Sequence, residues 1–111
     1  MSARDDFDPE AIFTKLSEAG EYWADCQAAA EMYEENKKTV LAQLMNDLDG
    51  STNAERERQA LASWLYVEHL EAMVGARKEA YKARVRYDSL KVLAEMRRTQ
   101  ESTRRAEANL R

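Results

Sequence analysis

Helix-interrupting residues cluster at two places in this chain, and their distribution is the strongest constraint on its fold. The 111 residues include three glycines and one proline, and the two clusters are Asp8-Pro9 and the run 49–53. Most β architectures need a turn signal about every 8–12 residues, so the sequence excludes them. We therefore predict an all-α protein with one central turn.

The same residues indicate where helices begin and end. Asp8 is a suitable N-cap with Pro9 at the first helical position, and Gly50 suits a left-handed C-terminal cap. A residue within 51–53 can then cap a second helix. We expect one domain made of a flexible N-terminus (1–8), an acidic first helix (9–49), a turn (50–53) and a second helix with a basic C-terminal part (54–111).

Hydrophobic spacing indicates that the two helices pair with each other. Alternating steps of four and three residues are typical of a coiled-coil seam. The first helix has this seam at Ile12, Leu16, Ala19, Trp23, Cys26, Ala30, Tyr33, Lys37, Val40 and Leu44. The second has it at Met73, Ala76, Ala80, Ala83, Tyr87, Leu90 and Ala94. The two seams predict a long antiparallel helical hairpin.

The chain has more apolar surface than one helical neighbour covers. A second stripe on the second helix comprises Val74, Tyr81, Val85, Val92 and Met96. A lone pair of helices buries too little to offset about 1–2 kcal/mol of backbone entropy per residue. We therefore predict a homodimer that forms a four-helix arrangement.

A fold at Gly50 sets the expected register. Residues whose numbers sum to about 101 should face each other, so Tyr33 should lie near His69 and Trp23 near Lys78. In this register the residues 94–111 have no partner on the first helix.

Charge is distributed unevenly along the chain. Residues 1–76 carry 6 basic and 16 acidic side chains, whereas residues 77–111 carry 11 basic and 5 acidic ones. In one interpretation the basic part contacts nucleic-acid phosphates. In the other it lies against the acidic first helix and fixes the antiparallel register.

The second interpretation does not apply to two arginine pairs, because they lie beyond the expected start of the first helix. Arg97 and Arg104 are seven residues apart, as are Arg98 and Arg105, so the two pairs share one side of a helix. We take these four as candidate nucleic-acid-binding residues. Glu101 lies between the pairs, however, so a solvated ion-pair face explains the same spacing.

The acidic helix suggests other partners. Glu31, Glu34 and Glu35 are candidate protein-binding residues of a surface that mimics DNA. Such a surface would inhibit a host nuclease or a CRISPR-type complex. A third interpretation is a purely structural coiled-coil adaptor.

Side chains that carry catalysis are scarce. Cys26 is the single cysteine and His69 the single histidine, which excludes metal sites built from clusters of these residues. The glycines are isolated and form no phosphate-binding loop. We expect no enzymatic activity, metal, cofactor or small-molecule substrate. Because no apolar run approaches about 20 residues and the start is acidic, we also expect no membrane association and a cytoplasmic location.

The C-terminal sequence contains residues that support a resemblance to a known group of proteins. Its residues are Arg86-Tyr87, Leu90-Lys91 and the run from Arg97-Arg98-Thr99 to Arg104-Arg105-Ala106. With these, the segment 81–107 resembles the C-terminal part of small, mostly uncharacterised helical proteins of tailed phages and prophages. The resemblance implies an accessory protein of the kind found among recombination or replication genes, and it assigns no reaction.

The resulting hypothesis is a non-enzymatic phage accessory protein that acts in DNA transactions. It would bind nucleic acid or a DNA-handling protein. Whether the second helix continues through Gly75 is left open by the sequence.

Overall fold

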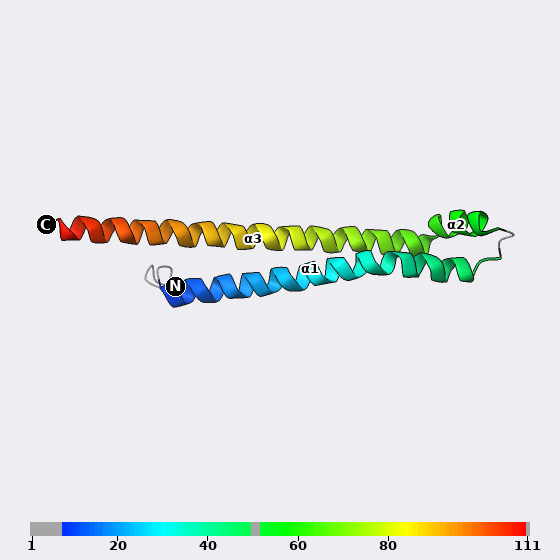
Figure 1. Cartoon of the computed structure of the whole chain (residues 1–111), viewed down its shortest axis with the longest axis horizontal. Coiled ribbons are helices and arrows are strands. Elements are labelled where there is room, and N and C mark those ends of the chain that lie inside the picture. The colour runs from blue at the N-terminus through cyan, green and yellow to red at the C-terminus, as the bar shows by residue number, and fades with distance from the viewer. Residues whose placement is uncertain (1–7, 50–51, 111) are drawn as a thin grey trace. The chain divides into compact units, whose positions relative to one another are not determined.

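The computed structural model describes residues 8–49 and 52–110. In chain order these contain α1 (Pro9–Asn46), α2 (Asn53–Leu61) and α3 (Trp64–Asn109), as Figure 1 shows. The fold is an all-α helical hairpin, as predicted, and the described ranges contain no strand. The expected flexible N-terminus, apart from Asp8, and the expected cap at Gly50 lie outside the described residues.

Tertiary contacts divide the protein into two units. In each unit a segment of α1 runs antiparallel to a segment of α3. Unit 1 contains the described residues 8–23 and 82–110, and unit 2 contains 24–49 and 52–81.

Helix α1 begins where the sequence predicts and ends three residues earlier. The Glu10 N–H donates to Asp8 Oδ1 at 3.1 Å, so Asp8 is the N-cap. At the other end the Asp47 N–H donates to the Leu44 carbonyl at 3.2 Å, which is the tighter bonding of a closing helix turn. Acidic residues such as Asp47 are unfavourable at the negative end of the helix dipole. The helix therefore stops at Asn46 and not at Asp49.

The second helix expected over 54–111 is instead two helices, which corrects that prediction. Thr52 caps α2 by accepting the Glu55 N–H at 3.1 Å. Helix α2 ends at Leu61 with Ala62 as its C-cap, and Ser63 then caps α3, because its Oγ accepts the Leu65 N–H at 3.3 Å. A serine that bonds to the following backbone in this way competes with a continuous helix. Beyond this break α3 runs through Gly75 without interruption.

The seams predicted from hydrophobic spacing are confirmed. On α3 the seam residues Met73 and Ala80 are buried, and the other five are half-buried. On α1 Ala30 is buried and the remaining seam residues are half-buried, except for Tyr33, which is 37% exposed. Heptad spacing identifies these faces because it is a local property of each helix.

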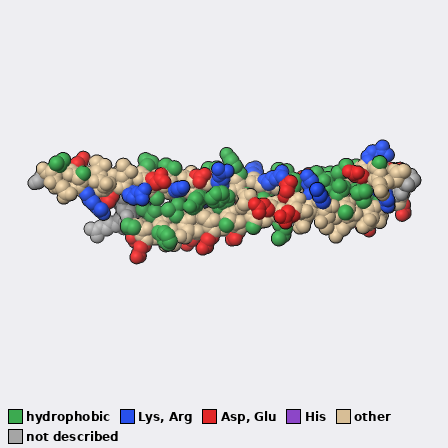
Figure 2. All heavy atoms as spheres, viewed as in Figure 1, with side chains coloured by type: hydrophobic (Ala, Val, Ile, Leu, Met, Phe, Trp, Pro, Cys, Tyr) green, Lys and Arg blue, Asp and Glu red, His purple; other side chains and the backbone are tan. Residues whose placement is uncertain are grey.

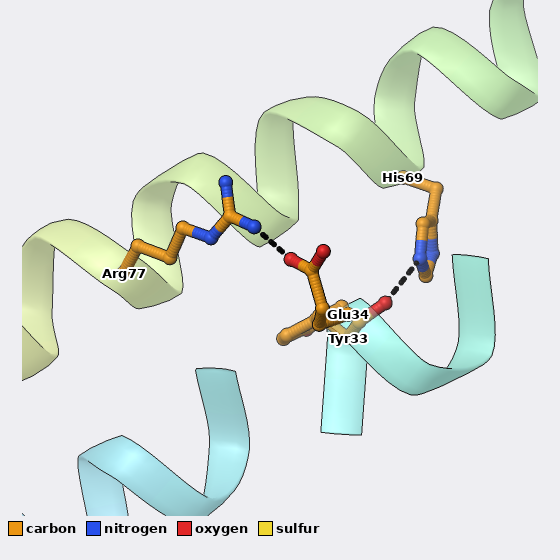
Figure 3. Close-up of polar contacts among 4 residues, drawn as sticks. All are labelled: Tyr33, Glu34, His69 and Arg77. Atoms are coloured by element: carbon orange, nitrogen blue, oxygen red, sulfur yellow. Dashed lines mark hydrogen bonds and ion pairs between the residues drawn. The ribbon is translucent and has the colours of Figure 1, made fainter. Parts of the chain in front are cut away.

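One of the two residue pairs predicted from the register is found, and the other is not. His69 Nε2 lies 3.0 Å from the Tyr33 carbonyl oxygen, as expected (Figure 3). Trp23, however, stacks on Tyr87 with ring centroids 5.5 Å apart, nine residues beyond Lys78. The reason is that the connection between α1 and α3 spans residues 47–63 and contains α2, so the pairing is not centred on Gly50.

Candidate nucleic-acid interface

The four predicted arginines lie together in unit 1. They line one open groove, with a volume of about 650 Å³, between the start of α1 and the C-terminal part of α3. Its described lining is Pro9, Ile12, Phe13, Leu16, Ala94, Arg97, Arg98, Glu101, Ser102, Arg104 and Arg105. The prediction that residues 94–111 have no partner on the first helix is wrong only where the stretch begins, because Ala94 and Arg97 are half-buried and line a second cavity with residues of α1. Residues 98–110 are exposed, apart from the half-buried Glu101.

Helical periodicity explains why the arginines converge. Seven residues make nearly two full turns of α3, so Arg97 and Arg104 project in similar directions, as do Arg98 and Arg105. Arg104 and Arg105 are exposed to 76% and 77%. They share one carboxylate, because Glu101 Oε2 lies 2.7 Å from Arg104 Nη2 and Glu101 Oε1 lies 3.9 Å from Arg105 Nε. Glu101 thus interacts with both guanidinium groups.

The other two arginines differ in their environment. Arg97 is half-buried and takes part in an intramolecular interaction. It also lines a smaller cavity of about 50 Å³ that shares Ile12, Leu16 and Ala94 with the groove. Arg98 is exposed and forms no ion pair with any residue that the structure describes. Arg98 is thus available to an incoming anion.

The floor of the groove is apolar. Ile12, Leu16 and Ala94 are half-buried between the helices, whereas Phe13 is 71% exposed. On the face drawn in Figure 2, hydrophobic side chains in green likewise reach the surface among basic side chains in blue. Phe13 is not among the site residues predicted from the sequence. The signal that could have found it is its position, one residue after seam residue Ile12 and on the flank of the helix.

A basic row on α3 is a second feature that the sequence reasoning missed. Arg84, Lys91, Arg98 and Arg105 recur every seven residues, and in unit 2 Arg77 occupies the same heptad position. Arg77 forms an ion pair with Glu34 of α1 (Figure 3). Arg84 Nε instead lies 3.8 Å from Asp88 of its own helix. The seven-residue spacing of these basic side chains in the sequence could have revealed the row.

The acidic candidates lie in unit 2. Glu34 is engaged by Arg77 across the helix pair, and Glu31 accepts a hydrogen bond from Gln27 Nε2 at 3.3 Å. Glu35 is exposed. One of the three predicted protein-binding acids thus contributes to helix pairing, which is the role that the register-fixing interpretation gave to such charges.

Other kinds of site were sought in the same residues. Within 8–49 and 52–110, no three His, Cys, Asp or Glu side chains are grouped closely enough to hold a metal ion. No helix in these ranges has both the length and the apolar character needed to cross a bilayer.

Comparisons with known protein families, curated proteins and solved structures find no match. The predicted relation to phage proteins therefore stays a prediction. The interpretation of the groove depends on its own geometry.

Proposed function

We propose that this protein is a non-enzymatic phage or prophage accessory protein that acts in DNA transactions by binding nucleic acid in the arginine groove of unit 1. One observation carries the proposal. Four arginines line this groove, and Glu101 is the single carboxylate among its described lining residues. The described lining of the groove therefore carries an excess of positive charge that an anionic ligand would neutralise.

Nucleic acid suits this excess better than a small anion does. The guanidinium groups of Arg98, Arg104 and Arg105 are distributed along two turns of α3, whereas one phosphate would engage one or two of them. A nucleic-acid backbone presents phosphates in a row, with one negative charge per roughly 3.4 Å of each strand of a duplex. A repeating anion can contact successive turns of the helix.

The direct test is an affinity comparison between two double variants. In Arg98→Ala/Arg105→Ala, we expect affinity for a fluorescein-labelled 20-mer DNA to fall about tenfold or more, because two charge-assisted contacts are lost. The control is Lys38→Ala/Arg58→Ala, which removes the same charge from exposed positions of unit 2. Fluorescence anisotropy at low salt measures both, and circular dichroism checks that the helices remain.

Absence of binding by the wild-type protein to any single- or double-stranded DNA or RNA at low salt would refute the proposal. Equal losses in the two double variants would refute the location of the site, since only net charge would then matter.

A homodimer is the second part of the proposal. In unit 1, Val85, Val92 and Met96 are about half exposed, and none of the described residues of this unit is buried. Helix pairs with so little burial gain stability from further helices. We expect sedimentation equilibrium to give a dimer and Val85→Asp/Val92→Asp to give a monomer. A wild-type monomer at 100 μM, roughly the upper range of such measurements, would contradict this part.

The remaining candidates have less support. Inhibition of a nuclease or a CRISPR-type complex through Glu31, Glu34 and Glu35 stays a prediction, and so does a purely structural adaptor. The ion pair between Glu34 and Arg77 occupies part of the surface that such an inhibitor would use.

A further inference from the structure

We infer that the arginine groove selects single-stranded over double-stranded nucleic acid by stacking an unpaired base on Phe13. This inference depends on the proposed function, because it names the form of nucleic acid that the same groove takes. Two features carry it: an exposed aromatic ring and the arginines that line the same groove.

The apolar part of the groove has no use in duplex binding. Double-stranded DNA keeps the faces of its bases inside the stack and offers phosphates and base edges. A phosphate would contact Arg98 or Arg105 and leave Phe13 in water. An unpaired base has an exposed π-face, and aromatic side chains beside a basic groove are the usual platform for such bases.

The positions of the residues on their helices are compatible with one ligand. Phe13 follows seam residue Ile12 on α1, and Arg98 follows Arg97 on α3, so each lies one position beyond a residue that faces the helix pair. Such positions flank the seam. All of these residues line the same groove of about 650 Å³, which is within the range of roughly 300–1,000 Å³ that holds small ligands. A base on the apolar floor therefore has arginines within the same cavity for its phosphates.

A second class of ligand is less compatible with these observations. An acidic peptide would satisfy the arginines, but its carboxylate side chains have no aromatic ring that could stack on Phe13. Stacking on the ring of Phe13 therefore distinguishes a nucleic acid with unpaired bases from an acidic peptide.

The test compares two oligomers of equal charge, (dT)20 and a 20-residue strand in which every sugar is abasic. If a base stacks on Phe13, the wild-type protein should bind (dT)20 about tenfold more tightly than the abasic strand. Phe13→Ala should remove this difference, and Phe13→Tyr should keep it because the ring is retained. Phe13→Leu should behave like the alanine variant, since it supplies apolar surface without a π-face. Phe13 is 71% exposed, so these changes leave the helix pairing in place.

The outcomes separate this inference from the proposed function. Equal affinity for (dT)20, the abasic strand and a 20-base-pair duplex, with loss in Arg98→Ala/Arg105→Ala, would overturn base stacking and leave nucleic-acid binding standing. Competition by poly-glutamate as effective as that by (dT)20 at equal charge would also overturn base stacking. No binding to any of the strands would overturn both.

Discussion

Units 1 and 2 are built from the same two long helices, but they differ in burial and in charge. All five buried residues among those described, Ala30, Ala60, Tyr66, Met73 and Ala80, belong to unit 2. Over the described residues, unit 2 carries six basic and eleven acidic side chains, whereas unit 1 carries nine basic and eight acidic ones. The stabilising core and the candidate binding groove thus occupy different parts of the hairpin.

The polar contacts differ in the same way. Unit 2 has polar contacts that cross between helices, namely Arg77 with Glu34 and His69 with the Tyr33 carbonyl (Figure 3), as well as local ones. In unit 1 the ion pairs of Arg84, Arg104 and Arg105 stay within α3. Contacts within one exposed helix contribute little to folding and are easily exchanged for contacts with a ligand. Cross-helix contacts suit a region that holds the fold, and local ones suit a region that binds.

The largest expected effect is on the free energy of unfolding, and it compares one seam residue of each unit. Met73→Ala should lower the free energy of unfolding by about 2–4 kcal/mol, because it opens a cavity at a buried position of unit 2. Leu90→Ala, at the half-buried seam of unit 1, should cost about half as much. Urea unfolding followed by circular dichroism measures both. An equal or larger cost at Leu90 would show that the division of the core between the units is wrong.

A smaller effect is expected at Gly75. A Cβ built there has no neighbour within 4 Å, so alanine adds helix propensity without a clash. Gly75→Ala should raise the free energy of unfolding by about 1 kcal/mol. Thermal unfolding of the two proteins at equal concentration measures the gain. A loss of stability would mean that something packs against this position in solution.

The smallest effect is expected at the cross-helix ion pair of unit 2. Both partners are about half exposed, at 52% for Arg77 and 46% for Glu34. A double-mutant cycle with Arg77→Ala and Glu34→Ala should give a coupling of about 0.2–1 kcal/mol that declines in 0.5 M salt. A coupling of zero at low salt would remove the contrast between cross-helix and local ion pairs.

The seams could be predicted from the sequence because heptad spacing depends on residues within one helix. The same local reasoning placed Arg97 with Arg104 and Arg98 with Arg105. The break at Ser63 could not be predicted in this way, because its cap lacks the acidic residue three positions later that marks a capping box.

The missed break had a consequence for the site. It lengthened the connection between α1 and α3, shifted the register and brought Phe13 into the groove with Arg98. Contacts between helices depend on this connection and are not encoded in either helix alone. The burial of Tyr66 likewise depends on tertiary packing and not on its own helix alone.

The most direct measurement of the central claim is the salt dependence of DNA binding. If four arginines of the groove neutralise phosphates, log K for (dT)20 plotted against log [NaCl] should have a slope of about −3. The slope should become about 1.4 units less steep in Arg98→Ala/Arg105→Ala, because two of the four contacts are lost, and should not change in Lys38→Ala/Arg58→Ala. A slope near zero in the wild-type protein, or an unchanged slope in the groove variant, would contradict the assignment of the groove as the nucleic-acid site.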